Sequence, residues 1–247
     1  MIKSIVKKVA RKAGFVPLSE VNMWDRRKSN LLNFQYKATD KEWRQLMMYF
    51  EIINAIEDVP GDVAEFGVAA GISLVSFIRI LRVLDRGKTR DEPRKIYGFD
   101  SFEGLPELSS HDSATDQLRS SPEMKRGGYN YPESYPVLFR YISSEPNAEL
   151  VKGWFEDSVS VFFKNNPHVA LALIHIDCDL YESTKIVLEH TWDRLSPNGL
   201  ILFDELHHPG FPGETVAFRE FFKDKPGQYT LHNIKSLPAK RFLIKKQ

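Results

Sequence analysis

The sequence predicts an α/β fold with a mostly parallel sheet, helices on both faces of that sheet, and an antiparallel terminal strand. Short apolar strands alternate with amphipathic helical segments along most of the chain, the pattern of a parallel sheet covered by helices. Several strands, such as LALIHID, are apolar at nearly every position, as expected for strands buried on both faces. We therefore expect a basic helix and arm over residues 1–40 and one α/β domain over residues 41–247.

The predicted elements follow one another in a regular order. Residues 40–58 form an amphipathic helix that VPGD ends. The strands are VAEFGV, KIYGFD, AELVKGWF, LALIHID, LILFDE and a closing pair, QYTLHNI and AKRFLIKK. The helices are ISLVSFIRILRVL, STKIVLEHTWDRL, which SPNG closes, and TVAFREFFKD. The polar stretch 103–146 is too long for a plain connection, so we expect a lid or an active-site insertion there.

Composition narrows the class of protein. Hydrophobic residues make up 42% and charged residues 27% of the 247 residues, as in ordinary globular proteins. The formal net charge of +1 gives no sign of a nucleic-acid partner. A single cysteine excludes a disulfide framework and disfavours a thiolate zinc site. Neither a membrane span nor a cleavable signal is recognisable, so we expect a cytoplasmic protein.

The N-terminus allows two interpretations. Residues 1–13 place Ile2, Ile5, Val6 and Val9 at helical spacing among five lysines and arginines, without an acidic residue. Such a helix could lie on the anionic inner face of a membrane, as a peripheral contact. Alternatively, it could be a frayed terminal helix or one that packs against a partner.

Acidic residues follow the first five predicted strands. In an open parallel sheet, ligands bind beyond the carboxyl ends of the strands, where the strand order switches. The acids near these ends are Glu65; Asp100; Glu156 and Asp157; Asp177 and Asp179; and Asp204 and Glu205. This regular placement at one edge of the sheet makes that edge the candidate site.

The glycine loop after the first strand differs from phosphate-binding loops. Glu65, Gly67 and Gly71 have the spacing E-x-G-x-x-x-G, whereas neither G-x-G-x-x-G nor a Gly-Lys-Ser/Thr run is present. The spacing resembles the loop that holds S-adenosylmethionine in Rossmann-like methyltransferases. The alternative is a tight strand-to-helix turn without a ligand.

Two further strand ends carry candidate nucleoside contacts. Asp100 could accept both hydroxyls of a ribose, or it could cap the turn that follows. Trp154 and Phe155 could stack on an adenine that Asp157 and Ser158 hydrogen-bond, or Trp154 could simply belong to the core.

The fourth and fifth strands end in the densest acidic cluster. Strand alternation places Asp177 and Asp179 on one side and Cys178, which we expect to be inert core, on the other. A neighbouring strand would bring Asp204 and Glu205 beside Asp177, and such carboxylates repel one another unless a cation lies among them. Oxygen ligands favour Mg²⁺, with Ca²⁺ or Mn²⁺ as alternatives. His175 shares the face of Asp177, and we interpret it as core or as a neighbour of the site rather than a ligand.

Five blocks of sequence carry a family resemblance. VPGDVAEFGVAAG, YGFDSFEGLPE, LVKGWFEDS, IDCDLYEST and LILFDE, in this order, resemble the TylF-like family of macrocin O-methyltransferases over about residues 45–225. The resemblance implies a Rossmann-like class I methyltransferase sheet, S-adenosylmethionine as methyl donor, Mg²⁺ assistance, and a sugar hydroxyl of a glycosylated small molecule or glycan as acceptor.

The resemblance also implies residue roles. It makes Asp179 the general base and the insertion 103–146 a helical lid over the substrate. It implies that the metal ligands are Asp177, Asp204 and Glu205. It implies that the donor is held by Glu65, Gly67, Gly71, Asp100, Ser101, Trp154, Asp157, Ser158 and Asp177.

Three departures from the family pattern concern the acceptor more than the reaction. Glu205 stands where the family usually has Asp. The glycine loop reads Ala69-Ala70-Gly71-Ile72 in place of a bulky or basic pair and Gly-Gly. The run Pro212-Gly213-Glu214-Thr215 replaces P-G-A-R, and His207 and His208 add unfamiliar donors nearby.

Two other functions remain open from the sequence. Asp177-Cys178-Asp179 is a D-x-D triplet, which also marks glycosyltransferases that bind a nucleotide-sugar diphosphate through a metal. A degenerate, non-catalytic relative that acts as a binding protein is the other alternative. For the enzyme, we expect a homodimer, and the basic N-terminus favours a lipid-linked or envelope glycan as acceptor.

Overall fold

The computed structural model describes residues 38–84, 93–112, 123–235, 237 and 240–246. The basic helix predicted over residues 1–13 lies outside the described residues. The chain divides into two compact units, Met1–Gln45 and Leu46–Gln247. The predicted boundary at residue 40 stays a prediction. Among the described residues, no helix is both long and apolar enough to cross a bilayer.

The sheet of the second unit has seven strands in the order β3-β2-β1-β4-β5-β7-β6. The strands are β1 (Asp62–Phe66), β2 (Ile96–Asp100), β3 (Ala148–Lys152), β4 (Leu171–Ile176), β5 (Leu195–Phe203), β6 (Tyr229–Asn233) and β7 (Arg241–Lys245). β1 to β5 are parallel, and β7 runs antiparallel to both β5 and β6. The order reverses between β1 and β4, so ligands are expected at the carboxyl ends of these strands.

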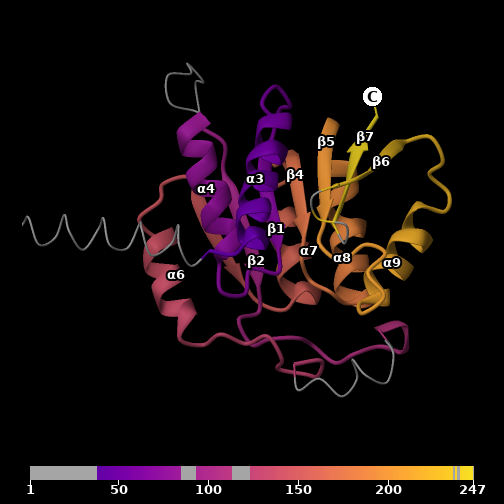
Figure 1. Cartoon of the computed structure of the whole chain (residues 1–247), viewed down its shortest axis with the longest axis horizontal. Coiled ribbons are helices and arrows are strands. Elements are labelled where there is room, and N and C mark those ends of the chain that lie inside the picture. The colour runs from indigo at the N-terminus through magenta and orange to yellow at the C-terminus, as the bar shows by residue number, and fades with distance from the viewer. Residues whose placement is uncertain (1–37, 85–92, 113–122, 236, 238–239, 247) are drawn as a thin grey trace, which may run out of the picture. The chain divides into compact units, whose positions relative to one another are not determined.

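Helices cover both faces of the sheet (Figure 1). On one face, α7 (Phe155–Asn165), α8 (Tyr181–Thr191) and α9 (Pro212–Phe222) pack into one apolar core. On the other, α4 (Ile72–Leu84) and the part of α3 (Asp40–Ala55) from residue 46 on pack into a second core. β4 serves both, because Ile174 belongs to the first core and Leu173 to the second. This two-sided burial explains the continuous apolar run that predicted the strand.

The third predicted strand was too long. β3 ends at Lys152, and the Trp154-Phe155 end assigned to it lies at the start of α7. The helix α7 is not predicted by the sequence pattern, because its run of Val and Phe residues has the composition of a strand. β5 begins at Leu195, the last residue of the predicted helix, and includes the segment 196–199 that was expected to close that helix. The helix α8 ends earlier, at Thr191, and a 3₁₀ turn, Trp192–Arg194, follows it.

The insertion 103–146 is anchored to the domain at two points. Its described parts include a 3₁₀ turn, Ser110–Asp112, and α6 (Ser134–Ile142). The buried Asp112 accepts the backbone N–H of Tyr181, the first residue of α8, through Oδ1 at 2.7 Å. Leu138 of α6 packs on Gly71, where an added Cβ would lie 2.5 Å from the leucine side chain. The insertion therefore crosses the carboxyl ends of the strands (Figure 1).

Candidate active site

A cavity of about 320 Å³ lies at the carboxyl ends of the central strands, under the insertion. Seven of the predicted site residues line it: Gly67, Asp100, Ser101, Trp154, Asp177, Asp179 and Glu205. The insertion contributes Leu105, Pro106, Tyr129 and Tyr131, and Phe211 closes another side. Glu65, Gly71, Asp157, Ser158 and Asp204 are not part of the lining.

Gly67 lets two strand ends approach each other closely. Its φ is 94°, a conformation that favours glycine. A Cβ at this position would lie 1.8 Å from the carbonyl oxygen of Asp177. The N–H of Asp177 donates to the carbonyl of Phe66 at 2.9 Å. The glycine therefore lets the chain after β1 lie against the acidic segment after β4.

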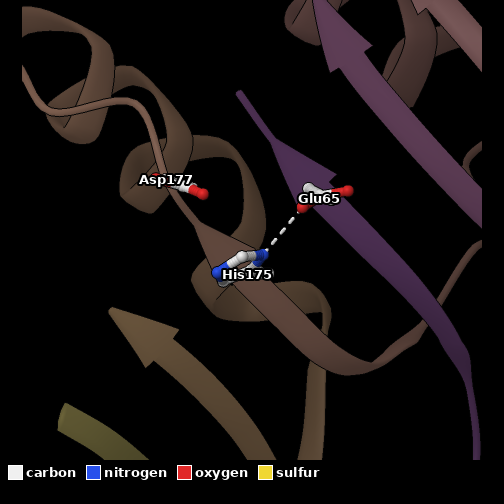
Figure 2. A group of neighbouring side chains, drawn as sticks. All are labelled: Glu65, His175 and Asp177. Atoms are coloured by element: carbon white, nitrogen blue, oxygen red, sulfur yellow. Dashed lines mark hydrogen bonds and ion pairs between the residues drawn. The ribbon is translucent and has the colours of Figure 1, made fainter. Parts of the chain in front are cut away.

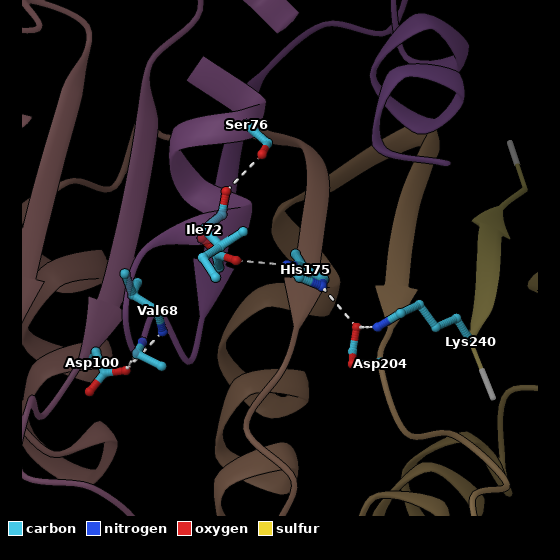
Figure 3. A network of polar contacts seen from close by, with 9 residues as sticks. Val68, Ile72, Ser76, Asp100, His175, Asp204 and Lys240 are labelled. Carbon is cyan, nitrogen blue, oxygen red and sulfur yellow. Dashed lines mark hydrogen bonds and ion pairs between the residues drawn. The ribbon is translucent and has the colours of Figure 1, made fainter. Parts of the chain in front are cut away.

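Asp100 supports the glycine loop. Its Oδ2 accepts the N–H groups of Val68 and Ala69, each at 2.8 Å (Figure 3). Its Oδ1 accepts the N–H of Phe102 at 2.6 Å. The capping interpretation is thus confirmed by these contacts. A ribose contact remains open as well, because each carboxylate oxygen can accept more than one hydrogen bond and Asp100 lines the cavity.

Of the residues predicted to bind adenine at the end of the third strand, only some line the cavity. Trp154 lines the cavity with Phe155 and Glu156, whereas the hydroxyl of Ser158 donates to the carbonyl of Gly153 at 3.3 Å. The sequence places Glu156 among the acids at the strand ends but gives it no specific contact with the donor. Because α7 begins at Phe155, Glu156 lies in the first helical turn, a position that the strand interpretation concealed.

The acids after β4 lie in a setting that favours their neutral forms. Burial raises the pKa of Asp177 to about 6, although the charge of His175 lowers it. Burial likewise raises the pKa of Asp179 to about 6, with Lys240 acting in the opposite direction. Asp179 has a φ of 63°, a left-handed conformation that Asp tolerates better than most residues. Both side chains face the cavity, and Cys178, expected to be inert core, is buried yet also lines it.

Glu214 joins this cluster from α9 and was missed as a site residue. It is fully buried, and its Oε1 accepts the backbone N–H of Glu205 at 3.1 Å. Burial raises its pKa well above the usual range, and the charges of Asp179 and Glu205 raise it further. The only signal in the sequence was its departure from the family run after Pro212-Gly213.

A chain of polar side chains runs beneath the cavity. Glu65 is fully buried, and its Oε1 lies 2.9 Å from Nδ1 of His175 (Figure 2). Nε2 of His175 lies 3.6 Å from Oδ1 of Asp204, which is also in contact with Nζ of Lys240 (Figure 3). The structure thus places Glu65 below the site rather than in the cavity. Lys240 was not identified from the sequence, because nothing local marks it.

Possible ligands for a divalent cation lie close together at this level. Glu65, His175 and Asp177 each offer one ligand atom, and these atoms all lie within 4.8 Å of one another (Figure 2). Asp204 adjoins them, because its N–H donates to the carbonyl of Ile176 at 3.0 Å. Glu205 lines the cavity, and its Oε2 lies 3.4 Å from Nδ1 of His208. Carboxylates crowded together in this way, among them Asp177 with its raised pKa, are a donor set that fits a hard cation.

Comparison with known proteins identifies relatives of the chain. The model of the macrocin-O-methyltransferase (TylF) family matches residues 38–234. The 8-demethyl-8-(2,3-dimethoxy-alpha-L-rhamnosyl)-tetracenomycin-C 4'-O-methyltransferase of Streptomyces olivaceus is 33% identical over 155 residues, 60% of this chain and 54% of the relative. The mycinamicin III 3''-O-methyltransferase of Micromonospora griseorubida is 32% identical over 176 residues, 68% of this chain and 64% of the relative. The chain thus spans between half and two thirds of these relatives.

Solved structures agree with the sequence relatives. The calicheamicin methyltransferase CalS11 superposes with a TM-score of 0.74 at 27% identity, over 88% of this chain and 85% of that protein. An O-methyltransferase from Bacillus cereus, solved in complex with SAH, has a TM-score of 0.52 at 12% identity over the full length of both chains. The latter likeness shows the fold alone.

Proposed function

Because this chain belongs to the TylF macrocin-O-methyltransferase family, we propose that it transfers a methyl group from S-adenosylmethionine to a hydroxyl of a sugar on a glycosylated molecule or glycan. The observation that carries this proposal is the convergence of Gly67, Asp100, Trp154 and Asp179 on one cavity at the switch in strand order. The relatives named as sugar O-methyltransferases support the choice of acceptor class.

The donor would bind along the glycine loop. Gly67 lines the cavity, and Asp100 would accept the ribose hydroxyls while it holds the loop. Ser101 and Trp154 line the same side, and Trp154 would stack on the adenine. Gly71, Asp157 and Ser158 would act indirectly, by shaping the loop and the start of α7. The cationic sulfonium suits a cavity lined by carboxylates.

Asp177, Asp204 and Glu205 would hold a divalent cation, Mg²⁺ in the first place. When bound, such a cation lowers the pKa of a coordinated hydroxyl and so favours its attack. Glu205 is longer than the aspartate that the family usually has, and it faces the cavity. Glu65 would contribute from below by holding His175 in place.

Asp179 would accept the proton of the acceptor hydroxyl as the new C–O bond forms and the S–C bond breaks. It faces the cavity beside Asp177, and its raised pKa of about 6 makes it a better proton acceptor than an exposed aspartate. Tyr129 and Tyr131, from the insertion, would exclude water and pack against the acceptor.

The setting of the protein rests on the sequence. We propose a cytoplasmic homodimer, with the basic residues 1–13 as a possible peripheral contact with the inner face of the membrane. Gel filtration of the full chain, and its sedimentation with anionic vesicles, would test the two statements separately.

Calorimetric titration with S-adenosylmethionine, with and without Mg²⁺, tests the proposed reaction class. We expect micromolar binding of the methyl donor and none of a UDP-sugar used as control. Binding of the UDP-sugar alone would contradict the proposal and favour a glycosyltransferase. Transfer of a labelled methyl group from the donor to glycan or glycoside pools would then identify the acceptor.

A further inference from the structure

Lys240 is a buried cation at the edge of the acidic cluster. Its side chain is 8% exposed, and its Nζ contacts Oδ1 of Asp204, whose side chain is 13% exposed. Lys240 directly precedes β7, whose first residue, Arg241, pairs with Phe203 at the end of β5. Lys240 therefore lies beside Asp204, as Figure 3 shows. Burying an ammonium group costs free energy unless the group is paired, so this ion pair helps to hold the C-terminal hairpin in place.

The charge of Lys240 extends beyond Asp204. It lowers the pKa of Asp177 and of Asp179, and for Asp179 it opposes the rise in pKa that burial causes. Both aspartates line the cavity, whereas Asp204 and Lys240 are not part of its lining. The lysine therefore offsets part of the repulsion among acids that follow two different strands, β4 and β5.

One oxygen of Asp204 is already in use. Oδ1 contacts Lys240 and lies 3.6 Å from Nε2 of His175, which Glu65 holds from the other side. A divalent cation held by Asp204 would therefore be close to the ammonium of Lys240. Two cations at such a distance repel strongly in a partly buried site.

We propose that Lys240 is a built-in counter-ion of the acidic cluster and competes with the divalent cation for the charge of Asp204. This inference rests on the metal binding proposed above. Without metal, Lys240 keeps the cluster stable. With metal, the two cations share Asp204, so Lys240 weakens metal binding and keeps the site readily exchangeable. The lysine would set metal affinity without touching substrate.

An ordinary structural ion pair would behave differently. Loss of Lys240 would then lower the stability of the protein by the same amount with and without Mg²⁺, and metal affinity would stay constant or fall as Asp204 lost its position. The competition predicts opposite signs: lower stability without metal, and tighter metal binding.

The test measures the affinity of the full-length protein for Mg²⁺ by calorimetry, and its melting temperature in EDTA and in Mg²⁺. The variants are Lys240→Met, which removes the charge, and Lys240→Arg, which keeps it. Lys246→Met is the matched control, because Lys246 is exposed in the same hairpin. Lys240→Gln, which keeps a hydrogen-bond donor for Asp204, replaces Lys240→Met if that variant does not fold.

We expect the neutral variants to bind Mg²⁺ on the order of tenfold more tightly than the wild type, the effect of one nearby charge. Their melting temperature should fall in EDTA and recover in Mg²⁺, while Lys240→Arg and Lys246→Met stay close to the wild type. Equal or weaker Mg²⁺ binding by both neutral variants would overturn this inference but leave the proposed function standing. If the wild type and all variants bind no Mg²⁺, the proposed metal site itself is wrong, and the inference falls with it.

Discussion

At the residue scale, the candidate site depends on backbone conformations that few residues adopt. Gly67 has a φ of 94° and Asp179 a φ of 63°. The first conformation brings the chain after β1 against the carbonyl of Asp177. The second occurs at Asp179, which lines the cavity. Both residues could be selected from the sequence, but for their chemistry and not for these angles.

Replacing Asp179 by Asn should abolish methyl transfer while leaving S-adenosylmethionine affinity nearly unchanged. Asn tolerates the left-handed backbone and has nearly the same shape, so the variant loses only the proton acceptor. Turnover with a labelled donor and calorimetric binding of that donor measure the two effects. Full turnover in the Asn variant would show that another group is the base.

Replacing Gly67 by Ala should lower the free energy of unfolding by about 2–5 kcal/mol, since the added Cβ meets a backbone carbonyl that cannot move aside cheaply. Gly227→Ala is the control: its φ is 80°, and nothing lies within 4 Å of the added Cβ. It should cost only the backbone strain of about 1–2 kcal/mol. Urea denaturation of both variants gives the comparison, and equal losses would show that close approach at Gly67 is unimportant.

At the element scale, the insertion is positioned by contacts from distant parts of the chain. Asp112 caps the first turn of α8, and Leu138 of α6 fits against Gly71. Gly213 leaves the space for this cap, because a Cβ there would lie 1.9 Å from Oδ1 of Asp112. The insertion is therefore held against both the glycine loop and the start of α9.

Asp112→Ala should loosen the insertion. The change removes a helix cap, which stabilises by about 1 kcal/mol, and leaves the N–H of Tyr181 without that acceptor. We expect faster hydrogen exchange over residues 103–112 and 123–146 and weaker donor binding, with little change in the sheet. Asp112→Asn keeps the acceptor oxygen and should restore most of the protection. Unchanged exchange in the Ala variant would exclude Asp112 as the anchor.

At the scale of the whole molecule, polar side chains from strands far apart in sequence meet beneath the site. Glu65 on β1, His175 on β4, Asp204 after β5 and Lys240 before β7 form one series across the sheet. Glu214 approaches the same acids from α9. Because these groups are buried and ionisable, we expect the stability of the fold to depend on pH.

Replacing Glu214 by Gln should stabilise the metal-free protein increasingly as pH rises above about 4.5, the usual pKa of an exposed Glu. The folded protein keeps the Glu214 proton because its pKa is raised, whereas the unfolded chain releases it. The wild type therefore loses stability with pH by up to about 1.4 kcal/mol per unit, and the Gln variant, which still accepts the Glu205 N–H, lacks this contribution.

Urea denaturation in EDTA from pH 4 to pH 8 measures that difference. Below pH 4.5 the two proteins should be similar, because Glu214 is protonated in both the folded and unfolded wild type. A constant difference across the range would mean that Glu214 is ionised in the folded protein and that its burial is compensated in another way.

The sequence by itself determined the order of the strands, most of the helices between them, and the main acids that follow the strand ends. These features are local, because strand periodicity and the residue that follows a strand are both read along the chain. The boundary between β3 and α7 was the exception, since Val and Phe suit a buried helix as well as a strand.

Only the tertiary structure decided which of these residues face the cavity and which lie beneath it. Glu65 and Asp204 looked equivalent to Asp177 in sequence, yet Glu65 pairs with His175 and Asp204 with Lys240. Lys240 joins the cluster from a segment that carries no local mark of it, and Glu214 is marked only by its departure from the family run. The physical reason is that the burial and pairing of a charge depend on elements brought together across the sheet, which no stretch of neighbouring residues specifies.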